Sequence, residues 1–141
     1  MSIVRALTRA APAFILAAGL SAAAPAAAQP VLNALAPIAP GQWLLRIAGE
    51  RPRAMCVTNP EALIQIRHRA SACSRLVIAD EKASATVHYS CPSAGWGRTT
   101  LRVATANAVR ISTQGIADNA PFAFEADARR TGDCPARSAS R

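Results

Sequence analysis

The stretch CSRLVIADEKASATVHYSC, residues 73–91, decides the fold. Its second half alternates apolar and polar side chains, which is the period of a half-buried β-strand. Its first half is rich in branched apolar residues, and Glu81 and Lys82 lie between the two halves. We therefore predict an antiparallel hairpin with strands at 73–80 and 84–91. The predicted inward face of the second strand carries Ala85, Val87, Tyr89 and Cys91.

The register of this hairpin decides whether Cys73 and Cys91 can bond. When Val77 faces Val87, both cysteines fall on the same face, at the open end of the hairpin. A slip of one residue would turn Leu76 inward but would separate the two sulfurs. The slip would also leave a two-residue Glu-Lys turn, and neither residue readily adopts the positive φ that such a turn requires. The sequence therefore favours a Cys73–Cys91 disulfide.

The remaining cysteines, Cys56 and Cys134, would then form the second of two disulfides. A metal site or a redox site would need two cysteines close together in the sequence, and all four are widely spaced here. We accordingly expect no metal ion and no cofactor. An even number of cysteines in an exported chain is typical of structural disulfides.

The N-terminus has the three parts of a secretory signal peptide. Arg5 and Arg9 precede an apolar core at 10–20, and a run of small residues ends at Ala28. We predict cleavage between Ala28 and Gln29, which removes residues 1–28. The chain would then be periplasmic or secreted, and soluble, because no later run approaches the length of a membrane-spanning helix.

The rest of the chain predicts a single β-rich domain at 41–134. Residues 29–40 contain three prolines and should form an extended segment, and residues 135–141 should form a flexible tail. A Thr-Asn-Pro-Glu start at 58–61 predicts one short helix over 59–69, with His68 and Arg69 on its exposed side. The fold class is mainly β: an antiparallel curved sheet or open barrel of six or seven short strands. Besides the hairpin, strands are expected at 42–47, 53–57, 98–104, 109–114 and 122–128, with loops at 92–97 and 115–121.

The net charge of +8 comes almost entirely from arginine, and Lys82 is the only lysine. The arginines are dispersed, with no run longer than two and few aromatic neighbours, so we interpret them as solvated surface. Nucleic acid is not an expected partner, because a single-strand groove interleaves aromatic rings with charges. An anionic envelope surface such as a glycolipid is the better polyanion for an exported protein.

The sequence provides no constellation of catalytic residues. The two histidines are isolated, and no nucleophile elbow, phosphate loop or zinc-protease motif is present. Because no nucleophile and base can be named together, we expect a protein that is not an enzyme.

Several short motifs in order resemble one family. They are Gly41-Gln42-Trp43, then Cys56 within a Cys-Val-Thr-Asn-Pro-Glu run, then Cys73, Cys91 and the Gly132-Asp133-Cys134 ending. The chain resembles small exported bacterial proteins grouped as a domain of unknown function. Two positions differ from the pattern of this family. Leu44 occupies the position after the Trp, where the family often has an acidic residue, and Thr131 occupies the position before the Gly, where the family often has an apolar one. The resemblance implies an exported β-rich domain and carries no activity.

The leading functional hypothesis is a non-catalytic envelope binding or accessory protein. The alternatives are a small inhibitor or partner-binding module and a binder of anionic glycolipid. Four aromatic residues could face a protein or small apolar ligand from a concave sheet, although a role in the core is the more common use of such side chains. These residues are Trp43, Tyr89, Phe122 and Phe124.

Overall fold

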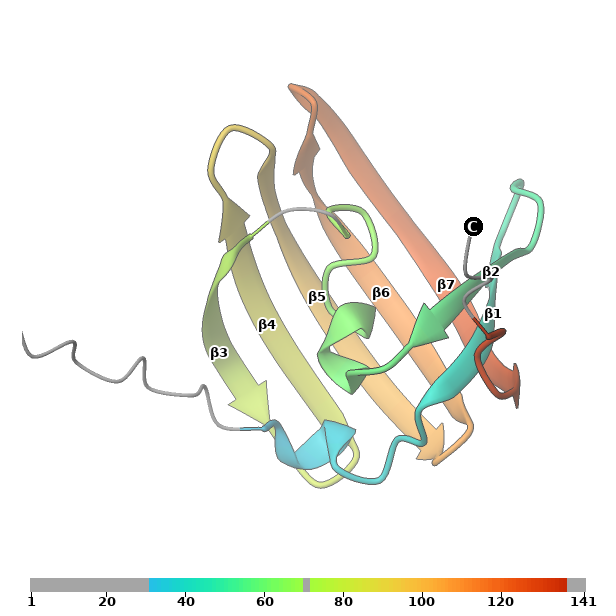
Figure 1. Cartoon of the computed structure of the whole chain (residues 1–141). Helices are drawn as coiled ribbons and strands as arrows, with labels where there is room; N and C mark the ends of the chain where they lie inside the picture. The colour runs from blue at the N-terminus through green and yellow to red at the C-terminus, as the bar shows by residue number, and fades with distance from the viewer. Residues whose placement is uncertain (1–30, 70–71, 137–141) are drawn as a thin grey trace, which may run out of the picture.

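A computed structural model describes residues 31–69 and 72–136, and these residues form one open, curved, seven-stranded antiparallel sheet (Figure 1). The predicted signal peptide, its cleavage site and the end of the tail lie outside the described residues. The strands are β1 (Gly41–Ile47), β2 (Arg53–Val57), β3 (Ser74–Asp80), β4 (Ser84–Cys91), β5 (Gly95–Thr105), β6 (Ala108–Ala117) and β7 (Ala120–Gly132).

The strand order is β2-β1-β7-β6-β5-β4-β3. The five strands from β3 to β7 follow one another as a meander, and β1 pairs with the free side of β7. The two edges of the sheet are therefore β2 and β3, and the sheet does not close into a barrel.

The predicted hairpin is confirmed, including its register. Val77 pairs with Val87, and both disulfides, Cys73–Cys91 and Cys56–Cys134, are formed. A β-bulge lies between Val77 and Ala79 and kinks the edge strand.

The later strands are longer than predicted. Residues 115–121 were expected to be a loop, but β6 continues to Ala117 and β7 begins at Ala120. Asp118 and Asn119 form the two-residue turn between them, both with positive φ. Asp and Asn tolerate this conformation better than other non-glycine residues, which allows so short a turn.

The core lies on the concave face of the sheet. Every strand except β3 contributes fully buried apolar side chains, with Trp43 and Tyr89 as the largest. Gly97 leaves space for Tyr89, because a Cβ at that position would overlap the tyrosine ring. The other large core residues are Leu45, Val57, Val87, Leu101 and Ile111.

The predicted helix over 59–69 is wrong. Only a single 3-10 turn, η2 (Pro60–Leu63), forms, with the Asn59 side chain accepting a hydrogen bond from the Glu61 backbone N–H at 3.0 Å. Residues 58–69, which we call the crossing segment, lead away from β2 and pass in front of the concave face (Figure 1). Leu63, Ile64 and Ile66 are all buried there. Residues 63–66 are buried in succession, whereas an amphipathic helix would expose one side of such a run.

The segment before β1 is also less extended than predicted. A 3-10 turn, η1 (Asn33–Leu35), forms there, and Asp80 accepts hydrogen bonds from the backbone N–H groups of Asn33 (2.9 Å) and Ala34 (3.3 Å). Leu35 and Ile38 are buried, so this segment extends the core at one end of the sheet. Within the described part of the chain, no helix has the length and apolar character needed to cross a membrane.

Candidate functional site

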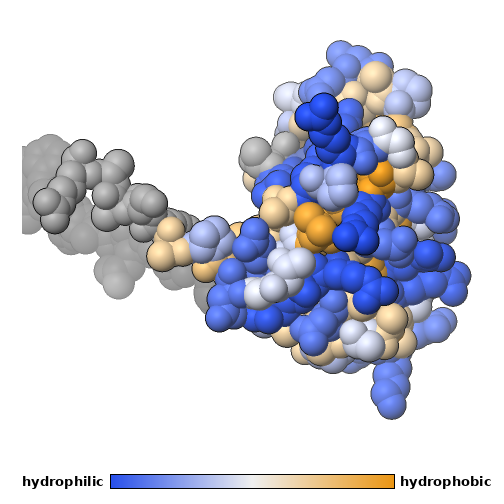
Figure 2. Space-filling model, turned by 90° about the vertical axis from the view of Figure 1, so that its right-hand side faces the viewer, coloured by the Kyte–Doolittle hydropathy of each residue, from blue (hydrophilic) through white to orange (hydrophobic). Residues whose placement is uncertain are grey.

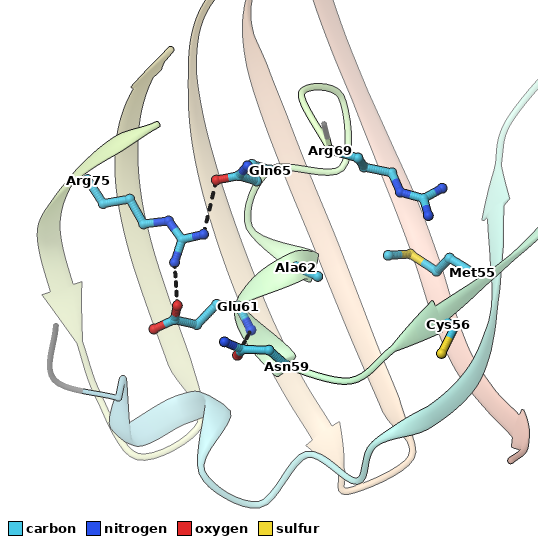
Figure 3. Close-up of a pocket in the computed structure, with 8 residues that line it drawn as sticks. All are labelled: Met55, Cys56, Asn59, Glu61, Ala62, Gln65, Arg69 and Arg75. Atoms are coloured by element: carbon cyan, nitrogen blue, oxygen red, sulfur yellow. Dashed lines mark hydrogen bonds and ion pairs between the residues drawn. The ribbon is translucent and has the colours of Figure 1, made fainter. Parts of the chain in front are cut away.

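One pocket lies between the crossing segment and the edge strands (Figure 3). Its volume is about 350 Å³. Arg75 of β3 forms an ion pair with Glu61 at 2.6 Å, and its second terminal nitrogen donates to the Gln65 side-chain oxygen at 3.0 Å. The remaining lining residues are Met55, Cys56, Asn59, Ala62 and Arg69.

The polar groups of this pocket mainly hold the protein together. Glu61 and Arg75 are about one-fifth exposed, at 21% and 17%, and each neutralises the other. The pair ties the crossing segment to β3, which is otherwise an edge strand with little buried surface. We therefore interpret the polar groups of this pocket as stabilising the fold rather than binding a ligand.

A buried polar network lies behind the crossing segment. Contrary to the prediction for His68, its side chain is only 5% exposed. One ring nitrogen is 3.1 Å from the Tyr89 hydroxyl, and the other is 3.1 Å from the Ala94 carbonyl oxygen. Burial raises the pKa of Tyr89 above its usual value, and a hydrogen bond with Thr113 opposes this increase. His68, Tyr89 and Thr113 are all buried, so the network is shielded from solvent.

The structure does not bring the four predicted ligand-facing aromatic residues onto one exposed surface. Trp43 and Tyr89 are fully buried, and the Trp43 indole N–H donates to the Ala39 carbonyl oxygen at 3.1 Å. Phe122 and Phe124 are half-buried neighbours whose ring centroids are 6.0 Å apart. In the part of the chain that the structure describes, no group of three His, Cys, Asp or Glu side chains is placed to hold a metal ion.

The convex face of the sheet carries a concentration of arginines that sequence analysis missed. Arg102 pairs directly with Arg110, Arg110 with Asp127, and Asp127 with Arg46. Four neighbouring strands, β5, β6, β7 and β1, therefore place three arginines and one aspartate in a single row. We call the convex surface around this row the arginine face, and it comprises Arg46, Arg98, Arg102, Arg110 and Arg129.

Few of these charges are paired within the protein. Arg110 donates to the Asp127 carboxylate at 3.1 Å, and this hydrogen bond and the nearby carboxylates raise the pKa of Arg110. Among the described residues, the side chains of Arg46, Arg98, Arg102 and Arg129 have no hydrogen-bond or ion-pair partner. Residues directly opposite on neighbouring antiparallel strands have Cβ atoms about 5 Å apart, so Arg102 and Arg110 place two like charges side by side, and Asp127 offsets this repulsion only in part.

Three shallow hollows run along the arginine face and share residues. The largest, about 440 Å³, includes Arg46, Arg110, Asp127 and Arg129. The next, about 230 Å³, shares Arg110 and adds Arg102 and Glu125. The third, about 220 Å³, shares Thr100 and Ser112 with the second and adds Arg98 and Gln114. Because neighbouring hollows share lining residues, we treat the three together and call them the trough.

The surface seen from the β1 and β2 side is mainly hydrophilic, and its apolar areas are small (Figure 2). Such a surface suits a polar partner better than an apolar one.

Each arginine of the trough occupies an outward position of an alternating strand, and this alternation was the sequence signal that could have indicated the arginine face. Only the pairing registers reveal that the outward positions form one row.

No protein-family model, curated protein or solved structure with which the chain was compared matches it.

Proposed function

We propose that this protein is an exported, non-catalytic binding protein that holds an anionic glycolipid of the cell envelope on its arginine face. The predicted signal peptide and the two disulfides support a periplasmic or secreted location, since structural disulfides persist in oxidising compartments. The ligand would be held by charge-assisted hydrogen bonds from guanidinium groups, which match the geometry of phosphate and carboxylate.

The observation that carries this proposal is the direct opposition of Arg102 and Arg110, with three further arginines around them that lack protein partners. Like charges at directly paired positions destabilise a sheet. An anion bound between them would remove the repulsion. The net charge of the arginine face, five arginines against Glu125 and Asp127, remains positive.

The experiment is co-sedimentation with phosphatidylcholine vesicles that do or do not contain a phosphorylated glycolipid. The double variant Arg46→Gln/Arg129→Gln removes two charges from the arginine face. The matched control Arg51→Gln/Lys82→Gln removes two exposed charges from turns elsewhere. Each arginine near an anionic surface contributes about 1 kcal/mol, so we expect about a 30-fold loss of binding for the first variant and a small loss for the control.

Binding should also weaken steeply as salt is added, because exposed charges are screened. Equal losses in the two double variants would mean that only net charge matters and would overturn the proposal. Binding to neutral vesicles that equals binding to glycolipid vesicles would overturn it as well.

A second candidate function is binding of a protein partner at the β3 edge. Leu76, Val77 and Ile78 are 64%, 46% and 47% exposed on a strand with one unpaired side, which is the geometry used in β-strand addition. The bulge after Val77 opposes such pairing, because bulges protect sheet edges. A protein that co-purifies with the wild type but not with Val77→Lys would favour this function.

A further inference from the structure

We infer that the part of the ligand that contacts the arginine face is an acidic glycan, an extended chain of sugars bearing acid groups, lying along β5 and β6. The inference rests on the proposed function and specifies its ligand. Four kinds of group lie on the trough or at its end: guanidinium groups, carboxylates, neutral hydroxyl and amide groups, and one exposed tryptophan.

Trp96 provides a flat apolar surface at one end of the trough. It is 40% exposed and stacks on His88, with the ring centroids 5.5 Å apart and the planes at 28°. Trp96 and Arg98 are two residues apart on β5 and therefore point to the same side of the sheet. A sugar ring presents an apolar C–H face next to polar edges, and an aromatic ring beside a charged group complements both.

Neutral polar groups lie between the arginines. Thr100 and Ser112 are directly paired across β5 and β6, and Gln114 pairs with Arg98. Hydroxyl and amide groups can both donate and accept hydrogen bonds, as sugar hydroxyls do. A ligand made only of phosphates could accept hydrogen bonds from these groups but would leave their acceptor atoms unused.

The two carboxylates of the trough point to the same chemistry. Glu125 pairs with Ser112 and lines the same hollow as Arg102, and Asp127 lies between Arg110 and Arg46. Both would repel a plain polyanion. An ionised carboxylate accepts hydrogen bonds, so each can bind a sugar hydroxyl while the neighbouring arginines bind the acid groups.

The length of the trough requires a ligand of several units. Trp96 and Arg102 are six residues apart on one strand, a distance of about 20 Å at 3.3 Å per residue. From Arg102 the charged row crosses three more strands to Arg46. A single small anion would contact only a fraction of this surface.

The test compares polymers that have the same acid group with and without sugar hydroxyls. Polygalacturonate is paired with polyglutamate, and phosphomannan is paired with polyphosphate. Binding is followed by intrinsic fluorescence, because the chain has two tryptophans and Trp43 is fully buried. We expect at least one glycan to bind more tightly than its hydroxyl-free counterpart and to change the emission of Trp96.

Two variants sharpen the result. Ser112→Ala removes a hydroxyl shared by two hollows and leaves the charge unchanged, and Thr58→Ala, outside the trough, is its control. We expect Ser112→Ala to weaken glycan binding about three- to tenfold and to weaken binding of the hydroxyl-free polymers less, because those polymers use only the donor of the hydroxyl. Trp96→Ala removes the fluorescent reporter, so its glycan binding is measured by calorimetry; it should weaken by a similar or larger factor, while the emission of Trp43 reports that the fold is intact.

The outcomes separate this inference from the proposed function. If each glycan and its hydroxyl-free counterpart bind equally, and Ser112→Ala and Trp96→Ala have no effect, the inference is wrong and anion binding stands. If none of the four polymers binds at low salt, both fail.

Discussion

Tyr89 shows how one residue joins the sheet to the segment that covers it. Its ring lies over Gly97 in the core, and its hydroxyl is 3.1 Å from His68 of the crossing segment. Sequence alternation predicted correctly that Tyr89 points inward. The partner of its hydroxyl could not be predicted, because His68 was expected on the exposed side of a helix that does not form.

The raised pKa of Tyr89 predicts a loss of stability at high pH. The unfolded chain releases the phenolic proton near the usual pKa of 10.0, whereas the folded protein retains it to higher pH. Above that pH the folded state binds more protons than the unfolded state, so the contribution of Tyr89 to the free energy of unfolding is constant below about pH 10 and falls above it. Urea unfolding across this range should show the fall in the wild type and a smaller one in Tyr89→Phe.

The assignment is direct, because the chain contains one tyrosine. At neutral pH, Tyr89→Phe should lose about 1 kcal/mol for the missing hydrogen bond. A tyrosinate absorbance transition in the folded protein at or below pH 10.0 would contradict the prediction.

Among the elements, the β3–β4 hairpin was the most predictable. Three features of its sequence predict the same register: the alternation of apolar and polar residues, the length of the turn, and the placement of Cys73 and Cys91 on the same face. The crossing segment was not predictable from local signals. Asn59 caps a first turn, but the chain must then pass across the concave face of the sheet. A helix over 59–69 would advance only about 1.5 Å per residue, less than half the reach of an extended chain.

The two disulfides should differ in their contributions to stability. Cys73–Cys91 closes a sequence separation of 18 residues and Cys56–Cys134 one of 78. The loop-closure argument gives about 3 and about 4.5 kcal/mol. Urea unfolding of Cys73→Ala/Cys91→Ala and Cys56→Ala/Cys134→Ala should therefore show the larger loss for the second pair. The reverse order would mean that local packing, rather than the entropy of the unfolded chain, dominates.

At the scale of the whole molecule, the arginine face exists only when the sheet is assembled. Its residues come from four strands and are spread from Arg46 to Arg129 in the sequence. Arginines dispersed in the sequence predict ordinary solvated surface, whereas the pairing registers of the strands bring them together on one face. The sheet is open, and the crossing segment covers its concave face. The stability of the whole fold should therefore depend on the Glu61–Arg75 pair, which ties this segment to the edge strand β3.

Breaking the Glu61–Arg75 pair should loosen the crossing segment. The pair is largely removed from water, so Glu61→Gln or Arg75→Met should each lower the free energy of unfolding by about 1–3 kcal/mol, between the values of exposed and fully buried pairs. The double variant should lose less than the sum of the two, because neither charge is left alone. Hydrogen exchange should accelerate at residues 63–66 before it does in β5 and β6. Additive losses would show that the two charges act independently.

The position of β1 between β2 and β7 has a consequence for the order of folding. The side chain of Arg130 reaches the Pro40 carbonyl oxygen across 90 residues of sequence, and β1 pairs with β7 along its length. During synthesis the β1–β2 hairpin emerges before the other strands of the sheet, and β7, the other neighbour of β1, emerges after them. Contacts this distant in sequence form slowly. The pairing of β1 with β7 therefore cannot form until β7 has been synthesised, so until then the β1–β2 hairpin is joined to the rest of the sheet only through the chain.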